Sequence, residues 1–262
     1  MQDFLSKKPI VIAALHLPQF KRGTAVDRAY LEDYLLSNLK VFAEGGIPAV
    51  KIQDQTSVLD RANPETIAWM SSLGRLARQE FPQLTLGAIV EAHDPYAALA
   101  IANACGFSFV RIKVFVGAML KSSGLQQACG IEAVTYRDLI RAHTVKILAD
   151  VHDRTGFSLV DMPIEQGERW AVNIGADALI LTGSTFEESM EILTRARQQN
   201  LKRPLILGGS ATAENIGQVL KVADGVIVSS ALKRKGASED ILQWDISLVK
   251  QFMDAVHQVV EN

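Results

Sequence analysis

Short runs of apolar and β-branched residues alternate with amphipathic segments along the whole chain. Eight runs have the length and composition of buried strands, and they cover residues 9–16, 49–53, 85–90, 109–114, 145–151, 178–182, 204–208 and 225–229. Apolar residues at helical spacing predict helices over residues 27–45, 64–80, 94–105, 131–142, 163–174, 186–199, 214–222 and 244–260. This repeated order of strand and helix is typical of parallel βα units.

Eight βα units with no break in composition predict a single (β/α)8 TIM barrel over residues 1–262. An open, doubly wound sheet is the alternative. The pairs Asn63-Pro64 and Asp94-Pro95 are suited to begin helices, because an Asn or Asp cap is followed by proline in the first turn. The longest segment without a predicted element, residues 117–130, follows the fourth strand, and we interpret it as a binding loop or lid.

Composition narrows the class of partner. The formal net charge is −2, which provides no general attraction for nucleic acid. No apolar stretch is long enough for an integral membrane segment, and the N-terminal apolar run is interpreted as the first strand because Asp3 precedes it and no cleavage pattern follows. Only Cys105 and Cys129 are present, too few for a disulfide framework, so a reducing, cytoplasmic location is expected.

The stretch "KILADVHD" at residues 146–153 places ionisable groups inside an otherwise apolar strand. Strand side chains alternate between two faces, so Asp150 and His152 share one face with Leu148, while Ile147 and Ala149 lie on the other. Other predicted strands also end in polar residues, and in a barrel such ends meet at the active-site mouth. We therefore predict catalytic roles for a group of strand-end residues: Asp150, His152, Lys113, Glu91, Asp54 and His16. The alternative is a purely structural ion-pair network that also includes Arg111 and Lys146.

Glycine and serine follow the seventh and eighth predicted strands. Small residues allow backbone N–H groups to approach a phosphate closely, and a helix expected to begin near Thr212 or Ala213 would add a favourable dipole. We assign phosphate binding to residues in these turns and at the end of the sixth strand: Gly208, Gly209, Ser210, Ser229, Ser230, Thr182 and Gly183. Ordinary tight turns are the alternative.

Two further chemistries stay open. His16, His93 and His152, together with Asp54, Asp94 or Asp150, are candidate ligands for a divalent metal, although no HxH or HExxH spacing supports this. Lys113 or Lys51 is a candidate for Schiff-base formation with a carbonyl substrate if desolvation lowers its pKa.

Several ordered segments resemble the BtpA/SgcQ family, named for a photosystem I biogenesis factor and a protein of a sugar-metabolism gene cluster. They are "VIAALHLP" at 11–18, "EGGIPAVKIQD" at 44–54, "DPYAALAIANACGFSFVRIKVFVGA" at 94–118, "VKILADVHD" at 145–153, "GADALILTG" at 175–183 and "ADGVIVSSALKRKG" at 223–236. The resemblance implies a TIM-type barrel. The matching polar positions are His16, Asp54, Arg111, Asp150, His152, Thr182 and Gly183, whereas Glu91 and Lys113 depart from the family pattern.

Two functions are compatible with these features. The first is an enzyme that binds a phosphorylated small-molecule substrate, such as a sugar phosphate, with lyase or isomerase chemistry in which Asp150 and His152 act as base and partner. The second is a non-catalytic assembly or stability factor, as the photosystem name of the family suggests. Association into a homo-oligomer through the outer helices is compatible with both.

Overall fold

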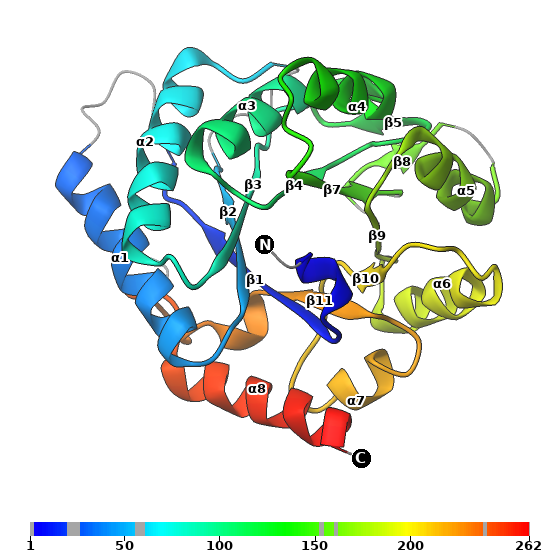
Figure 1. The fold of residues 1–262 in the computed structure, drawn as a ribbon. Helices are drawn as coiled ribbons and strands as arrows, with labels where there is room; N and C mark the ends of the chain where they lie inside the picture. The colour runs from blue at the N-terminus through cyan, green and yellow to red at the C-terminus, as the bar shows by residue number, and fades with distance from the viewer. Residues whose placement is uncertain are drawn as a thin grey trace.

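The computed structural model describes residues 3–19, 27–55, 61–151, 155–159, 162–237 and 240–261. Eight parallel strands close into a barrel in the circular order β1-β11-β10-β9-β7-β4-β3-β2 (Figure 1). These strands are β1 (Ile10–His16), β2 (Ala49–Gln53), β3 (Thr85–Ile89), β4 (Phe109–Ile112), β7 (Lys146–Asp150), β9 (Ala178–Leu181), β10 (Leu205–Leu207) and β11 (Gly225–Val228). Neighbours in the ring are also successive barrel strands along the chain. This confirms the predicted TIM barrel and excludes the doubly wound sheet.

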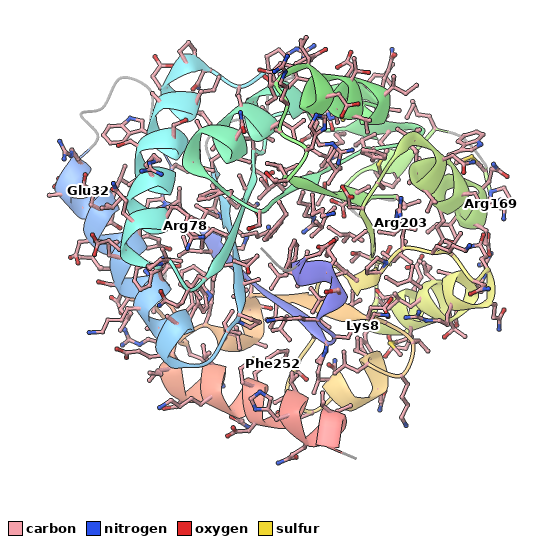
Figure 2. The ribbon with its side chains drawn as sticks, in the orientation of Figure 1. Lys8, Glu32, Arg78, Arg169, Arg203 and Phe252 are labelled. Atoms are coloured by element: carbon pink, nitrogen blue, oxygen red, sulfur yellow. The ribbon has the colours of Figure 1, made fainter. Side chains whose placement is uncertain are left out.

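The helices form a ring outside the barrel (Figure 1). They are α1 (Arg28–Glu44), α2 (Pro64–Glu80), α3 (Pro95–Cys105), α4 (Gly130–Leu139), α5 (Ile164–Ile174), α6 (Phe186–Gln198), α7 (Ile216–Val219) and α8 (Ile246–Glu261). Phe252 on α8 is buried against the barrel, whereas Arg169 on α5 is exposed (Figure 2). Within the described ranges, no helix combines the length and apolar character that a membrane span requires.

Two helix starts follow the predicted capping chemistry. Asn63 Oδ1 accepts a hydrogen bond from Thr66 N at 2.7 Å, and Asp94 Oδ1 accepts one from Ala97 N at 3.1 Å. Each side chain satisfies a backbone donor that has no partner within the helix. These caps explain why α2 and α3 begin where the sequence predicts.

The seventh helix is shorter than expected. We predicted residues 214–222, but α7 has only four residues, from Ile216 to Val219. Before it, Thr212 N donates to Asn215 Oδ1 at 2.8 Å and Asn215 N donates to Thr212 Oγ1 at 3.3 Å. This reciprocal turn takes up the residues expected to start the helix. Thr212 and Ala213 therefore do not begin it, and such a short helix adds little dipole to the turn after β10.

Apolar side chains form two layers. The larger lies between strands and helices and includes Ile147 and Ala149, while Leu148 lies inside the barrel, as the alternation along β7 predicts. A 3-10 helix, η1 (Phe4–Ser6), covers the N-terminal end of the barrel, where Phe4 packs on Phe109 with ring centroids 5.1 Å apart. In the described part of the chain, η1 therefore covers the N-terminal end of the barrel interior.

The sequence predicts an irregular loop over residues 117–130, after β4, but the structure has a regular hairpin there. The segment contains β5 (Ala118–Lys121) and β6 (Gly124–Gln127), which form a hairpin, and β8 (Phe157–Ser158) pairs with β5 on the other side. Gly117 and Gly124 have φ angles of 76° and 112°, which glycine adopts without steric cost. The strands lack the β-branched residues that identify the barrel strands, so periodicity alone did not reveal them.

Candidate functional site

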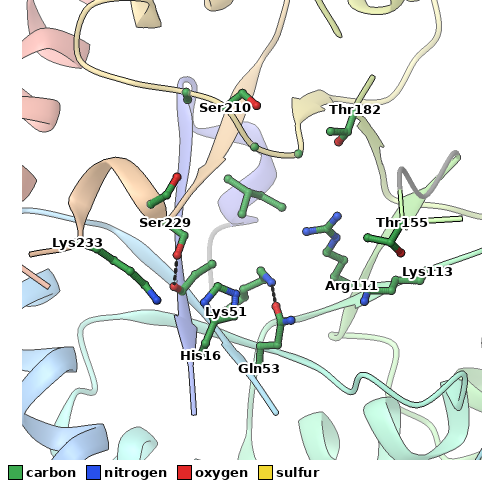
Figure 3. Close-up of a pocket in the computed structure, with 16 residues that line it drawn as sticks. His16, Lys51, Gln53, Arg111, Lys113, Thr155, Thr182, Ser210, Ser229 and Lys233 are labelled. Atoms are coloured by element: carbon green, nitrogen blue, oxygen red, sulfur yellow. Dashed lines mark hydrogen bonds between the residues drawn. The ribbon is translucent and has the colours of Figure 1, made fainter. Parts of the chain in front are cut away.

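A cavity of about 350 Å³ lies at the C-terminal ends of the barrel strands (Figure 3). This volume is within the range of small-ligand pockets. Of the residues predicted from sequence to form the site, eight line the cavity: His16, Lys113, Thr182, Gly208, Gly209, Ser210, Ser229 and Ser230. The strand ends that lie far apart in the sequence thus converge on one space.

The cavity lining is strongly basic. Its ionisable side chains are His16, Lys51, Arg111, Lys113 and Lys233. No Asp or Glu lines it within the described part of the chain. A cavity lined by groups of one sign focuses the field on a ligand of the opposite sign. The arrangement therefore favours an anionic ligand.

Arg111 is held by a buried carboxylate. Its Nε donates to Asp150 Oδ2 at 2.8 Å and its Nη2 donates to Asp150 Oδ1 at 2.9 Å. Asp150 is only 1% exposed and does not line the cavity, whereas Arg111 does. Because both carboxylate oxygens bind the guanidinium, this geometry suits Asp150 to positioning Arg111 and does not suit it to the general-base role predicted above.

A polar chain links the second and fourth barrel strands. Lys113 Nζ binds Glu91 Oε2 at 2.7 Å, and the same carboxylate accepts a hydrogen bond from Gln53 Nε2. The Gln53 amide oxygen in turn accepts a hydrogen bond from Lys51 Nζ. Glu91 does not line the main cavity, whereas the lysines and Gln53 do (Figure 3). The chain of side chains therefore presents the lysine nitrogens to the main cavity, while the Glu91 carboxylate lines a smaller neighbouring hollow.

Lys51 is the most deeply buried lysine of the cavity. It is 2% exposed, and desolvation lowers its pKa well below the usual range of a lysine. The nearby charges of Arg111 and Lys113 lower the pKa further, and Glu91 and Asp150 offset this only in part. An amine with a lowered pKa is available as a base or nucleophile near neutral pH. Of the two lysines proposed for Schiff-base formation, Lys51 therefore fits better than Lys113, which is paired with Glu91.

His16 is held in its neutral form. Burial lowers its pKa to about 3, and the nearby positive charges of Lys51 and Lys233 contribute. Tyr34 Oη donates to the backbone oxygen of His16 at 2.9 Å and so fixes the end of β1. A neutral imidazole has one donor and one acceptor nitrogen, and a hydrogen bond with the Gln53 side chain uses one of them.

The turn after β10 depends on glycine. A Cβ added at Gly208 would lie 2.0 Å from Thr182 Oγ1, so only glycine permits this approach. Ser210 follows with a left-handed φ of 64°, and its backbone oxygen accepts a hydrogen bond from Asn215 Nδ2 at 2.9 Å. Thr182 is 3% exposed, and its hydroxyl makes no hydrogen bond to any described residue. The hydroxyl is thus a buried polar group in the cavity wall, packed against Gly208.

The turn after β11 faces β1. Ser229 Oγ donates to the backbone oxygen of Ala14 at 3.2 Å, a bond drawn in Figure 3. Ser230 follows at the start of a second 3-10 helix, η2 (Ser230–Leu232). Lys233 comes directly after it, and its Nζ lies 4.9 Å from the centroid of the Trp244 ring. Burial lowers the pKa of Lys233, which marks a lysine turned inward.

Two further predicted residues, Gly183 and Asp54, do not line the cavity. Gly183 N donates to Ser189 Oγ at 2.9 Å, so this amide is used within the β9–α6 connection. Asp54 is fully buried and accepts a hydrogen bond from Glu91 N at 2.6 Å. His152 lies outside the described residues. The residues that the structure describes bring no three His, Cys, Asp or Glu side chains together as a metal site, so the divalent-metal hypothesis gains no support from them.

Sequence reasoning missed three contributors to the cavity. These are the polar residues Gln53, Thr155 and Lys233, which line the cavity but are not among the site residues predicted from sequence. A signal for Lys233 existed, because it follows the Ser229-Ser230 turn by three residues. Thr155 has no comparable signal, since it reaches the cavity from the segment after β7.

Relatives of this chain are found by sequence. The model of the BtpA family matches residues 7–258. An uncharacterized protein of Archaeoglobus fulgidus is 30% identical over 233 residues, which cover 86% of this chain and 91% of the relative. The photosystem I biogenesis protein BtpA of Synechocystis is 29% identical over 272 residues, which cover 97% of this chain and 90% of the relative.

Solved structures share the fold at lower identity. A native KDPGal structure has a TM-score of 0.61 at 14% identity and covers 96% of each chain. A 3-hexulose-6-phosphate synthase has a TM-score of 0.60 at 14% identity, with 95% of this chain and 99% of the synthase covered. At this identity the likeness extends to the barrel alone.

Proposed function

The chain belongs to the BtpA family, and from this premise we propose that it is an enzyme that binds a small phosphorylated metabolite, such as a sugar phosphate, and performs lyase or isomerase chemistry on it. One observation carries the proposal. The cavity at the C-terminal strand ends is lined by basic side chains and by the turns after β10 and β11, with no carboxylate among its described lining residues.

The turns after β10 and β11 are the proposed phosphate site. Gly209 and Ser210 belong to the first turn, Ser229 and Ser230 belong to the second, and all four line the cavity. Lys233 lines the same cavity and supplies positive charge, and Figure 3 shows it with Ser210 and Ser229. A phosphate monoester carries a charge of about −1.5 to −2 at neutral pH and has three strong acceptor oxygens. Backbone and hydroxyl donors with one lysine match that demand.

Lys51 is the proposed acid–base group. Its amine removes a proton from the carbon next to a substrate carbonyl, and the electron pair moves onto the carbonyl oxygen to give an enolate. Arg111 stabilises the negative charge of that enolate, and Asp150 keeps the guanidinium in place. If Lys51 returns the proton to another carbon of the enolate, the reaction is an isomerisation. If the electron pair of the enolate instead expels a leaving group from the neighbouring carbon, the reaction is that of a lyase. This assigns the base role predicted for Asp150 to a residue that faces the cavity.

A thermal-shift screen tests phosphate binding. The probes are inorganic phosphate, sulfate and a panel of sugar phosphates, applied to the wild type, Ser210→Asp and the control Ser122→Asp, which changes an exposed serine outside the cavity. A ligand present at about 100 times its dissociation constant stabilises the native state by about 2.7 kcal/mol. We expect a shift for wild type and control but not for Ser210→Asp. No shift with any phosphorylated compound would contradict the proposal.

A protein-binding role is the second candidate, and the small sheet favours it. Register pairs Leu120 with Leu125 and with Phe157, so these three side chains share one face, and they are 47%, 51% and 79% exposed. Exposed apolar clusters often mark interaction sites. Complementation of a deletion strain separates the candidates. If Phe157→Ser fails to restore growth and Lys51→Met restores it, the protein-binding role is supported. If Lys51→Met fails and Phe157→Ser restores growth, catalysis is supported.

A further inference from the structure

The cations of the cavity fall into two groups on opposite sides of the barrel. In the ring of strands, β4 is four places from β11 and three from β10, so it lies across the mouth from the two proposed phosphate-binding turns. Arg111 lies on β4, and Lys113 follows directly after it. Figure 3 shows these two side chains on the side opposite Ser229 and Lys233. One phosphate at the turns therefore leaves a second positive group facing the rest of the ligand.

The second group is built to stay in place. Side-chain exposure is 15% for Arg111 and 18% for Lys113. Each is fixed by a carboxylate that does not line the cavity, Asp150 for Arg111 and Glu91 for Lys113. Such support from behind orients a cation towards the ligand without placing negative charge in the cavity. An ordinary structural ion pair has no need to turn its cation towards an open space.

We infer that Arg111 and Lys113 form a second anion-binding subsite that binds a carboxylate of the substrate, placed next to the carbonyl group whose enolate Arg111 stabilises. The inference rests on the proposed function and deepens it, because it narrows the substrate to a phosphorylated hydroxy or oxo acid. The phosphate lies at the turns after β10 and β11, and the carboxylate lies against β4. Guanidinium and ammonium groups suit a carboxylate, which accepts charge-assisted hydrogen bonds from both. Lys51, on β2, lines the same cavity and is available to the carbon atoms of the ligand.

The test compares two ligands that differ at one group. Glycerol 3-phosphate and 3-phosphoglycerate have the same phosphate and chain length, but the second ends in a carboxylate. Calorimetric titration at constant ionic strength measures both dissociation constants. We expect 3-phosphoglycerate to bind at least tenfold more tightly to the wild-type chain. Equal affinity overturns the second subsite and leaves the phosphate site standing, whereas no binding of either ligand overturns both proposals.

Two variants test the residue assignment. The double variant Glu91→Gln with Lys113→Gln removes one cation and its partner together, so the net charge is unchanged and no carboxylate is left unpaired. Arg111→Lys keeps the charge beside Asp150 but loses the planar pair of donors. We expect the affinity ratio to fall at least threefold in each variant, with the affinity for glycerol 3-phosphate little changed. Lys233→Gln is the matched control, because it should weaken the binding of both ligands and leave the ratio of their affinities unchanged. An unchanged ratio in both test variants overturns the assignment.

Discussion

The two ends of the barrel both carry ionised side chains, but the balance of charge differs. At the N-terminal end, Asp224 binds Lys8, accepts from Leu205 N at 2.9 Å and pairs with Arg197 at 3.0 Å. Asp177, at the same end, pairs with Arg137 at 2.7 Å and accepts from Ile147 N at 2.9 Å. There, acidic groups sit at the centre of their networks and are surrounded by donors. Such networks pair their charges with one another and hold the strand starts.

At the C-terminal end of the barrel, basic groups face the open space and acidic groups hold them in place. Five basic side chains line one cavity, and the carboxylates that bind two of them, Asp150 and Glu91, do not line it. A structural network tends to neutralise its charges in place, whereas this one leaves positive groups towards an open space. The interpretation of the interior charges as purely structural therefore fits the N-terminal end and does not fit the mouth.

The largest expected effect breaks the N-terminal network. Asp224→Ala leaves the backbone N–H of Leu205 and two cations without their acceptor, and should lower the free energy of unfolding by about 3 kcal/mol. Urea unfolding measures the change, with Asp254→Ala on the exposed face of α8 as the control. Phosphate binding by the folded variant should be unaffected. If the stability matches that of the control, the network does not hold the strand starts.

Glu168 on α5 is a buried carboxylate outside both of these networks, and it tests what burial does to the pKa of an acid. Burial raises the pKa of Glu168 on α5 to about 7, although a hydrogen bond from Gln199 opposes the shift. The native state therefore holds a proton that the unfolded state has released between about pH 4.5 and 7, so stability falls as pH rises through this range. We expect the free energy of unfolding to fall by about 2 kcal/mol between pH 5 and pH 8. Glu168→Gln should remove that slope, and the exposed control Glu187→Gln should keep it.

Gly208→Ala tests the wall of the cavity. The added Cβ would lie 2.0 Å from Thr182 Oγ1 and 2.7 Å from Ile180 Cγ2, so the turn after β10 must move. We expect a loss of about 1–2 kcal/mol in stability together with loss of phosphate binding. Combining it with Thr182→Ala should restore part of the stability, because that change removes the closest atom. Gly217→Ala, whose Cβ would meet Val259 at 3.6 Å, serves as the control and should be nearly neutral.

Lys51→Met has the smallest expected effect on the free energy of unfolding. We expect it to raise this free energy, whereas Asp224→Ala should lower it. Desolvation and the neighbouring cations lower the pKa of Lys51, so the native state binds fewer protons than the unfolded state at neutral pH. Wild-type stability should therefore rise with pH more steeply than that of the variant. At pH 7 we expect Lys51→Met to be about 1 kcal/mol more stable than the wild type, yet inactive in any turnover assay. Destabilisation by the substitution would show that the lysine is structural.

Much of the architecture could be predicted from local chemistry. The strands and most helices occur where periodicity predicts them, because an apolar face must be buried and the spacing of its residues is visible in the sequence. The caps at Asn63 and Asp94 act within a few residues, so sequence suffices for them. The hairpin of β5 and β6 was missed, since its short strands lack β-branched residues and its pairing with β8 joins residues nearly forty positions apart, such as Met119 and Ser158.

The sequence by itself determined that this chain forms eight βα units and which residues end each strand, because both follow from short-range periodicity. Only the closed barrel decided which of those residues face a ligand. Asp150 and His16 look equally suitable in the sequence, yet Arg111, thirty-nine residues from Asp150, occupies both carboxylate oxygens. Lys51 and Lys233, distant in the chain, line the same cavity. Burial and pairing depend on contacts between remote segments, and those contacts exist only once the ring is closed.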